Sequence, residues 1–487
     1  MFKNIAWDFI GKFSAQLVRF IISVILARLL TPVEFGVVGM AMAIIIVAHI
    51  FLDLGFNGAI IQSKVVSQLQ YSTIFYLNAG MALLLTIGCY ILAHPLSRFY
   101  EQPEIEPVFK VLSLSFLLNG LNLVPAALLY RKLMLKLNSI MTIVASVVSG
   151  VVGVIMAFNG YGIWSLVTQT LLHSFLLLVL NFAYVRWLPS FSFSFPSLKP
   201  LWKYGSRMFA SGLLDNIYTR LDTFIIGKIF SVGILGYYTR AQSVDNFVRQ
   251  FSVNSIMGAL FPYIARQQDN RITLRDLYVR YLHIISFVSV ALSGILFLTA
   301  GPLFTLLFTS RWAYSAELFQ LIAIIGFAWP VSSLMCNIIA GVGNSKAFLR
   351  LEVYKKILFL PVYGLGFILG LKGFIGCFIA ANFIAIILNA FFVSAEIAIT
   401  VFAQIKIIAS YIVSGIISTA ILWYLSPHLS FSNPFSSILL LSAGFIFFYF
   451  LITFLLGLNA FKDSTLIIKK CKQFFNDKRY KNVPSTL

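Results

Sequence analysis

Long apolar runs alternate with short polar connections along the whole chain. A run of about 20 apolar residues is long enough to cross the hydrocarbon core of a bilayer as an α-helix. The pattern predicts about fourteen such spans, at residues 9–30, 36–62, 73–97, 107–130, 138–158, 162–185, 205–229, 233–264, 279–300, 315–341, 350–370, 373–396, 405–426 and 435–459. We therefore expect an all-α, polytopic membrane protein.

The polar connections also divide the chain into regions. The longest weakly apolar connection, at 186–203, is rich in Ser, Phe and Pro and separates two groups of six predicted helices. We predict an N-terminal six-helix lobe at 1–186, an inter-lobe cytoplasmic linker at 187–204, a second six-helix lobe at 205–397, transmembrane helices thirteen and fourteen at 398–460 and a basic cytoplasmic tail at 461–487.

An internal repeat relates the two predicted lobes. A shift of 200 residues places Gly36 on Gly236 and Arg28 on Lys228 without a gap. Six helices per half is an even number, so both halves enter the membrane in the same orientation. Parallel repeats of this kind are a transporter architecture, and such transporters bind substrate at the interface between the repeats.

Composition and charge agree with a membrane protein. Hydrophobic residues make up 60% of the chain and charged residues 11%, whereas about 25% of the residues in soluble domains are charged. The net charge of +20 does not indicate a nucleic-acid partner, because most Lys and Arg residues lie in the connections predicted on one side. The positive-inside rule then places both termini in the cytoplasm. The basic tail is expected to lie on the anionic inner leaflet, with binding to a partner as the alternative.

Several charged residues lie inside predicted spans, where charge is costly and usually functional. In the first span Lys12, Gln16, Arg19 and Ser23 share one face of a helix. This polar stripe predicts a wall of a solvated pathway. For Lys12 alone, extension of the side chain to the inner interface is the simpler interpretation.

The seventh predicted span carries Asp215 and Asp222 on one face, and Arg220 on nearly the opposite face. Arg220 therefore cannot neutralise both aspartates within its own helix. It either pairs with a neighbouring helix or lines a different wall.

In the eighth span, Asp245 precedes Arg249 by four residues, which is the favourable order for an ion pair within a helix. This pair either holds helices together or lines a wet surface, and the pattern leaves both interpretations open. Arg240 lies in the same span. Asp53 lies in the second span, where we consider Arg19 a possible partner.

The cations favour an anionic solute, because arginine suits phosphate and carboxylate groups. The predicted substrate-binding residues are Lys12, Gln16, Arg19, Arg220, Arg240 and Arg249; the predicted ion-coupling residues are Asp53, Asp215, Asp222 and Asp245. The coupling ion, H⁺ or Na⁺, stays open. Histidines and cysteines are scattered, and no nucleotide-binding glycine loop is present, so we expect no cofactor, no metal and no enzymatic activity.

Two groups of segments carry a family resemblance. The segments 26–36, 53–56 and 59–62 read Leu-Ala-Arg-Leu-Leu-Thr-Pro-Val-Glu-Phe-Gly, Asp-Leu-Gly-Phe and Ala-Ile-Ile-Gln. They resemble the opening of bacterial polysaccharide flippases of the Wzx type, in the MATE-like MOP superfamily. The segments 220–227 and 235–241 resemble the start of that family's second half. The similarity is closest to the colanic acid and teichuronic acid exporters and covers the first two-thirds of the chain.

The resemblance implies twelve to fourteen helices in two lobes, in a bacterial cytoplasmic (inner) membrane. It implies translocation of an undecaprenyl-pyrophosphate-linked oligosaccharide by alternating access, for O-antigen, capsule or exopolysaccharide synthesis. It also implies a cationic cavity, onto which Arg19, Arg220 and Arg249 map by position. The implied partners are the lipid-linked oligosaccharide, membrane lipid, and a polysaccharide polymerase with its chain-length machinery.

Two rival functions fit the sequence less well. A multidrug exporter on the same scaffold would favour acids over arginines in its cavity, because its guests are cationic. A membrane polymerase or ligase would need a sizeable outer loop, and the predicted outer connections are short.

Overall fold

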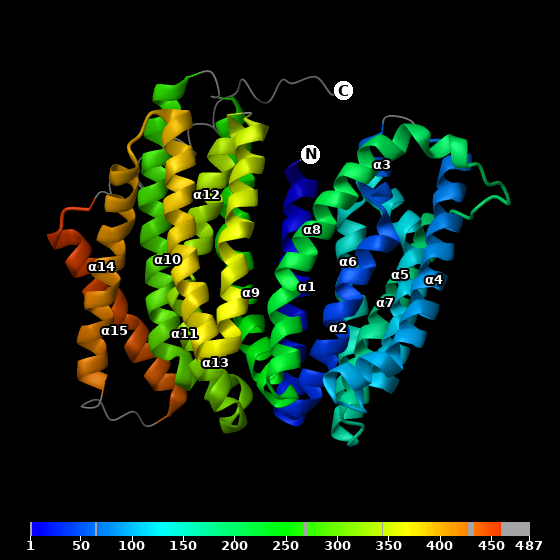
Figure 1. Cartoon of the computed structure of the whole chain (residues 1–487), viewed down its shortest axis with the longest axis horizontal. Helices are drawn as coiled ribbons and strands as arrows, with labels where there is room; N and C mark the ends of the chain where they lie inside the picture. Colours follow the sequence, from blue (N-terminus) through cyan, green and yellow to red (C-terminus); the bar gives the residue numbers. More distant parts are fainter. Residues whose placement is uncertain (1, 64–65, 267–269, 343, 427–432, 459–487) are drawn as a thin grey trace. The chain divides into compact units, whose positions relative to one another are not determined.

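The computed structural model describes residues 2–458 except 64–65, 267–269, 343 and 427–432. Within these ranges the chain is helical apart from its connections and contains no strand, and long helices run side by side (Figure 1). Ten of the helical segments in these ranges, given below, are long and apolar enough to cross a membrane. The prediction of an all-α membrane protein is therefore confirmed.

The chain divides into two compact units. The first comprises Met1–Arg240 and Leu307–Trp312. It contains α1 (Phe2–Leu29), α2 (Pro32–Asp53), α3 (Phe56–Gln62), α4 (Gln68–Tyr100), α5 (Ile105–Arg131), α6 (Leu135–Phe158), α7 (Ile163–Val185), the 3₁₀-helix η1 (Phe195–Leu198), α8 (Lys199–Ile229), the start of α9 (Val232–Arg266) and η2 (Ser310–Trp312).

The second unit comprises Ala241–Leu306 and Ala313–Leu487. Its helices are the rest of α9, nearly all of α10 (Arg271–Phe308), α11 (Ala313–Ile324), α12 (Ala328–Gly341), α13 (Ser345–Ile397), α14 (Val401–Leu425) and α15 (Pro434–Leu455). The lobe boundaries expected from the sequence stay a prediction.

Ten segments in the described part of the chain are long and apolar enough to cross a membrane. They are Pro32–Ile60, Gln68–Tyr100, Ile105–Arg131, Leu135–Phe158, Ile163–Val185, Arg271–Phe308, Ser310–Gly341, Ile368–Ile397, Val401–Leu425 and Pro434–Leu455. The helices α1, α8 and α9 are equally long but carry charged side chains along their length. These three helices hold nearly all the predicted site residues.

The structure interrupts several of the predicted helical segments, including the span at 315–341, which consists of α11 and α12. The span at 36–62 consists of α2 and α3, because Leu54 (φ 47°) and Gly55 (φ 77°) both adopt the left-handed conformation between them. The spans at 350–370 and 373–396 both lie within α13, where the non-helical residue Gly370 (φ 71°) separates two helices at a kink, as the sequence predicted. Glycine tolerates this conformation because it has no Cβ, so the chain changes direction there without a loop.

The N-terminus of α2 is set by its local sequence. The Thr31 side chain accepts from the backbone N–H of Glu34, and the Glu34 carboxylate accepts from the Thr31 N–H at 2.6 Å. Pro32 occupies the first turn, where its missing N–H costs nothing. This capping box ends α1 and starts α2 within two residues.

Two glycines that the repeat relates, Gly36 and Gly236, make equivalent contacts in the structure. A Cβ atom on Gly36 would overlap the carbonyl group of Val232, and a Cβ atom on Gly236 would overlap the carbonyl group of Pro32. Each residue in one contact lies 200 positions from a residue in the other. The first turns of α2 and α9 therefore cross in close backbone contact, and the two contacts are made by residues that the repeat relates.

A second pair of repeat-related residues makes matching contacts. The Arg28 Nε donates to the Leu307 carbonyl oxygen at 2.8 Å, and the Lys228 Nζ donates to the Phe99 carbonyl oxygen at 2.5 Å. Lys228 also pairs with Glu101 at 3.3 Å. Arg28 lies near the end of α1 and binds a carbonyl of α10, whereas Lys228 lies near the end of α8 and binds a carbonyl of α4.

Candidate functional site

Arg240, near the start of α9, is buried with 4% of its surface exposed. Its Nη1 donates to the Ser23 Oγ on α1 at 2.5 Å. Ser23 belongs to the predicted polar stripe of α1, so this hydrogen bond joins the stripe to α9. The two residues are 217 positions apart in the sequence.

Aromatic rings surround the Arg240 guanidinium. Its Cζ lies 4.1 Å from the centroid of Phe35 and 5.3 Å from those of Phe308 and Trp312. A cation over aromatic faces is stabilised, most strongly where water is excluded. Trp312 is fully buried, and its Nε1 donates to the Ala27 carbonyl oxygen at 2.7 Å. In this conformation Arg240 is a packing residue, and its binding of substrate stays a prediction.

The sequence did not indicate this aromatic cage. Phe35, Phe308 and Trp312 lie on three separate segments, and aromatic residues are frequent throughout the chain. One signal was available: the position related to Arg240 by the repeat is Met40, which is also buried. A cation that replaces a buried methionine needs a specific partner.

Asp222, on α8, accepts three hydrogen bonds. The donors are the Thr223 backbone N–H at 2.6 Å, the Thr223 Oγ1 at 3.1 Å and the Tyr238 hydroxyl at 2.8 Å. The bond from Tyr238 connects α8 to α9. These bonds fix the orientation of the Asp222 side chain, and its role in ion coupling stays a prediction.

Arg220 lies half-buried on α8. Its Nε is buried and has no hydrogen-bond partner among the described residues. A buried N–H without an acceptor costs about 1–3 kcal/mol, and more when the group is charged. The binding of substrate by Arg220 stays a prediction. Asp215 lies on the same helix, but its side chain is outside the described part of the structure.

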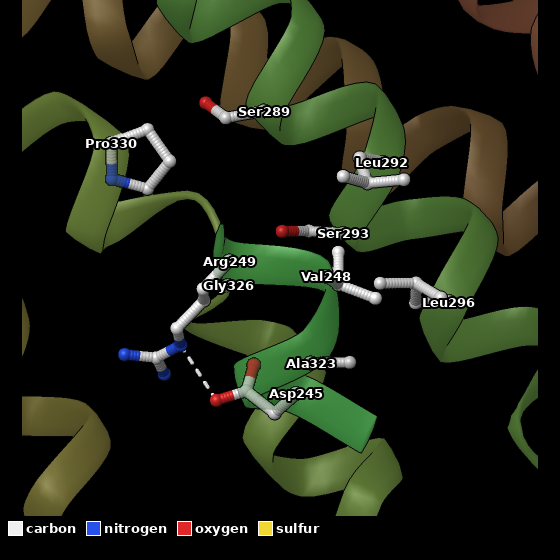
Figure 2. Close-up of a pocket in the computed structure, with 10 residues that line it drawn as sticks. All are labelled: Asp245, Val248, Arg249, Ser289, Leu292, Ser293, Leu296, Ala323, Gly326 and Pro330. Carbon is white, nitrogen blue, oxygen red and sulfur yellow. Dashed lines mark ion pairs between the residues drawn. The ribbon is translucent and has the colours of Figure 1, made fainter. Parts of the chain in front are cut away.

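Asp245 and Arg249 form the predicted ion pair on α9, which is thereby confirmed. The Arg249 Nε lies 2.6 Å from the Asp245 Oδ2 (Figure 2). The Asp245 side chain is 10% exposed and the Arg249 side chain 23% exposed. Both groups are thus largely removed from solvent and depend on one another for neutralisation.

This pair borders a small cavity of the second unit. α9 contributes Asp245, Val248 and Arg249; α10 contributes Ser289, Leu292, Ser293 and Leu296; the segment from α11 to α12 contributes Ala323, Gly326 and Pro330. Figure 2 shows Val248, Leu292 and Leu296 together, on the side away from the guanidinium. The cavity volume of about 20 Å³ suits a single water. A sugar or a pyrophosphate does not fit in this conformation.

The polar stripe of α1 is present as predicted. The Arg19 Nη2 donates to the Gln16 Oε1 at 3.1 Å, and both Lys12 and Arg19 are exposed. These side chains share a face of α1, as their spacing required. Their participation in substrate binding stays a prediction.

The suggested pairing of Arg19 with Asp53 is wrong. The Asp53 Oδ1 instead accepts the backbone N–H of Asn57 at 2.8 Å, across the break between α2 and α3. The first N–H groups of a helix have no partner within that helix. Asp53 therefore satisfies a group at the start of α3, and Arg19 makes no ion pair among the described residues.

The sequence of this chain is similar to those of known proteins. Residues 25–317 match the sequence profile of a family described as polysaccharide biosynthesis protein. The succinoglycan biosynthesis transport protein ExoT of Rhizobium meliloti (strain 1021) is 24% identical, and the match covers 70% of this chain and 69% of ExoT. The lipopolysaccharide biosynthesis protein WzxC of Escherichia coli (strain K12) is 25% identical over 70% of each chain.

Solved structures share the fold. The lipid II flippase MurJ, in an inward closed conformation, matches with a TM-score of 0.73 at 15% identity, covering 92% of this chain and 97% of MurJ. An inward-facing multidrug resistance MATE family transporter of the MOP superfamily matches with a TM-score of 0.62 at 15% identity, covering 80% of this chain and 96% of the transporter.

Proposed function

This chain belongs to the polysaccharide biosynthesis protein family, and we propose that it is a flippase for undecaprenyl-pyrophosphate-linked oligosaccharides. It moves these units across the bacterial cytoplasmic membrane, by alternating access, for the synthesis of a surface polysaccharide. The match over residues 25–317 carries the proposal. Relatives named for succinoglycan transport and lipopolysaccharide biosynthesis support it, and the fold it shares with a lipid II flippase agrees with it.

The distribution of charge supports an anionic substrate group. Arg19, Arg220 and Arg249 lie on helices that otherwise cross an apolar environment. Arg220 has an unused buried donor. A pyrophosphate supplies the acceptors that guanidinium groups bind best, through charge-assisted hydrogen bonds. We propose that each of these three arginines binds the anionic group of the substrate.

The placement of Arg249 supports alternating access. Its partner is Asp245, and the adjoining cavity holds only a water-sized volume. Arg249 therefore exchanges Asp245 for the substrate only when this region opens. Asp245 is then free to bind the coupling cation, H⁺ or Na⁺.

The location and partners complete the proposal. Both termini lie in the cytoplasm, where the connections are richest in Lys and Arg. The translocated unit passes to a polysaccharide polymerase and its chain-length machinery. The protein itself carries out transport and no covalent chemistry.

The test is a flipping assay with purified protein in liposomes. Fluorescent lipid-linked oligosaccharide is incorporated, and the fraction accessible to a membrane-impermeant quencher is followed over time. We expect transfer between leaflets at a rate well above that of empty liposomes. Equal rates with and without protein would contradict the function. Wild-type rates for Arg19→Gln and for Arg249→Gln would contradict the assignment of these residues.

A multidrug exporter is the second candidate, because MATE transporters share the fold. The same liposomes distinguish the two functions. Uptake of a cationic dye driven by an ion gradient, without flipping of the lipid-linked oligosaccharide, would favour the exporter.

A further inference from the structure

Residues 190–195, in the connection between α7 and α8, alternate between Ser and Phe, and their side chains alternate between half-buried and exposed. Phe191, Phe193 and Phe195 are exposed, whereas Ser192 and Ser194 between them are half-buried. Alternate residues of an extended chain point to opposite sides. One side of this connection is therefore polar and the other aromatic. We call Phe191, Phe193 and Phe195 the phenylalanine comb.

The polar side is tied to the first turns of α4. The Ser72 Oγ accepts from the backbone N–H of Ser190 at 2.9 Å, and the Thr73 Oγ1 accepts from that of Ser194 at 3.1 Å. The Gln68 Nε2 donates to the Leu188 carbonyl oxygen at 3.0 Å. These contacts hold the backbone in one orientation and present the comb outward.

Two apolar anchors flank these hydrogen bonds. Trp187 packs against Tyr71 and Phe75, with ring centroids 6.3 Å and 5.8 Å apart, and its Nε1 donates to the Gln68 Oε1 at 2.8 Å. Leu198 is buried in the same core cluster as Tyr71 and Phe75. The connection is thus fixed on both sides of the comb, and the comb's exposure is not the result of a loose loop.

The comb leaves a large aromatic surface uncovered. Phe191 is 104% exposed, Phe193 50% and Phe195 65%. The rings of Phe193 and Phe195 contact each other edge to face, with centroids 4.9 Å apart, so they form one continuous patch. Neighbouring patches of exposed phenylalanine mark an interaction surface.

The position of the comb and the basic residues near it indicate that its partner is an anionic lipid surface. The connection that carries the comb runs beside the first turns of α4 (Figure 1), at the end of the first unit where α7 ends and α8 begins. That end of the first unit carries basic residues, namely Arg131, Lys132, Lys136, Arg186 and Lys199. Clusters of Lys and Arg at the end of membrane helices bind anionic headgroups. Tyr184 of α7 and Leu69 of α4, the two helices that the connection follows and contacts, are also exposed.

With the orientation given under the proposed function, we propose that the phenylalanine comb inserts into the headgroup region of the anionic cytoplasmic leaflet and anchors the connection between α7 and α8 to the membrane surface. The serines fix its direction, the phenylalanines enter the lipid, and the basic residues bind the headgroups. This anchor is independent of the transported substrate. It predicts a lipid contact at a point where a cytoplasmic linker would otherwise lie in water.

The experiment uses the full chain with Cys89, Cys336, Cys377 and Cys471 replaced by Ser. Phe193→Cys and, as the matched control, Ser192→Cys are each labelled with a fluorophore whose emission reports polarity. Both proteins are placed in nanodiscs of phosphatidylethanolamine and phosphatidylglycerol. We expect blue-shifted emission at 193 and severalfold stronger quenching by lipids spin-labelled near the headgroup than at 192.

Further arms separate the alternatives. In nanodiscs of phosphatidylcholine alone, quenching at 193 should fall, because the basic residues lose their anionic partners. Stronger quenching at 193 by aqueous iodide than by spin-labelled lipid would overturn the proposal. Shielding of 193 from both quenchers, with cross-linking between copies through the same cysteine, would also overturn it and would indicate a protein partner.

A variant that keeps the fold guards against misfolding. The triple variant Phe191→Ser, Phe193→Ser and Phe195→Ser preserves the hydrogen bonds to α4. We expect it to purify with unchanged helicity. The label is then placed at Leu188→Cys, both in the triple variant and in the protein with an intact comb. We expect spin-labelled lipid to quench this label much less in the triple variant. Unchanged quenching at 188 would contradict insertion by the comb.

Discussion

Gly36 and Gly236 are related by the sequence repeat, and each faces the backbone of the other's helix. A Cβ atom on Gly36 would overlap the Val232 carbonyl group, and one on Gly236 would overlap the Pro32 carbonyl group. Backbone atoms cannot move aside as the end of a side chain can. The crossing of α2 and α9 thus depends on two glycines that the repeat places in equivalent positions.

Substitution of either glycine should destabilise the first unit. Overpacking of a close contact typically costs about 1–3 kcal/mol, and a clash with a carbonyl group belongs at the upper end. We expect Gly36→Ala and Gly236→Ala to lower the melting temperature in detergent. Gly233→Ala is the matched control, because its Cβ would meet only Val33 at an ordinary 3.7 Å. Equal melting temperatures for Gly236→Ala and Gly233→Ala would exclude the close crossing.

Removal of the Arg240 side chain should weaken the packing of α1 against α9. Arg240→Ala leaves a cavity among Phe35, Phe308 and Trp312, and truncation of a large buried side chain costs about 2–5 kcal/mol. Arg240→Met fills most of that space and copies Met40, its repeat-related residue. We expect a clearly lower melting temperature for the alanine variant than for the methionine variant. The reverse order would show that the charge, and not the packing, stabilises this region.

The Asp245–Arg249 pair allows stability to be separated from transport. Removal of one partner of a buried pair costs about 3–5 kcal/mol, because the other charge stays unpaired; the partial exposure of Arg249 reduces this value. We expect Asp245→Asn and Arg249→Gln to be destabilised singly, and the double variant to recover much of the stability. A double-mutant cycle on thermal unfolding measures the coupling. Additive effects would refute a specific pair.

The same double variant tests the role of Arg249 in transport. If Arg249 binds the substrate, the stabilised double variant still flips lipid-linked oligosaccharide poorly. A double variant with both normal stability and normal flipping would limit Arg249 to a structural role.

Arg220 should affect transport more than stability. Its buried Nε has no hydrogen-bond partner among the described residues, so Arg220→Gln removes no bond at that atom. We expect flipping to fall by about tenfold or more, which corresponds to about 1.4 kcal/mol of lost binding, at a nearly unchanged melting temperature. Arg275→Gln, at an exposed position on α10, is the control and should leave both unchanged. A large loss of stability in Arg220→Gln without a loss of flipping would oppose the assignment.

Local features of the site could be predicted from the sequence. The Asp245–Arg249 pair and the Gln16–Arg19 contact join residues four and three positions apart, and helix geometry alone brings such residues together. The pairing of Arg19 with Asp53 joined separate helices and failed. A backbone N–H at the start of α3 was closer to Asp53 than any cation was.

The sequence by itself determined the membrane-spanning helices and the repeat. The length of an apolar run and the spacing of charges are local properties, and the thickness of the bilayer sets the length that a span needs. Only the tertiary structure decided that Arg240 is held by Ser23 and by rings from Phe35, Phe308 and Trp312, and that Arg28 and Lys228 bind carbonyls of later segments. These contacts join positions about 70 to 280 residues apart. They depend on how the helices cross. Close backbone contacts, such as that of Gly36 with Val232, permit this crossing, and no short segment of sequence encodes it.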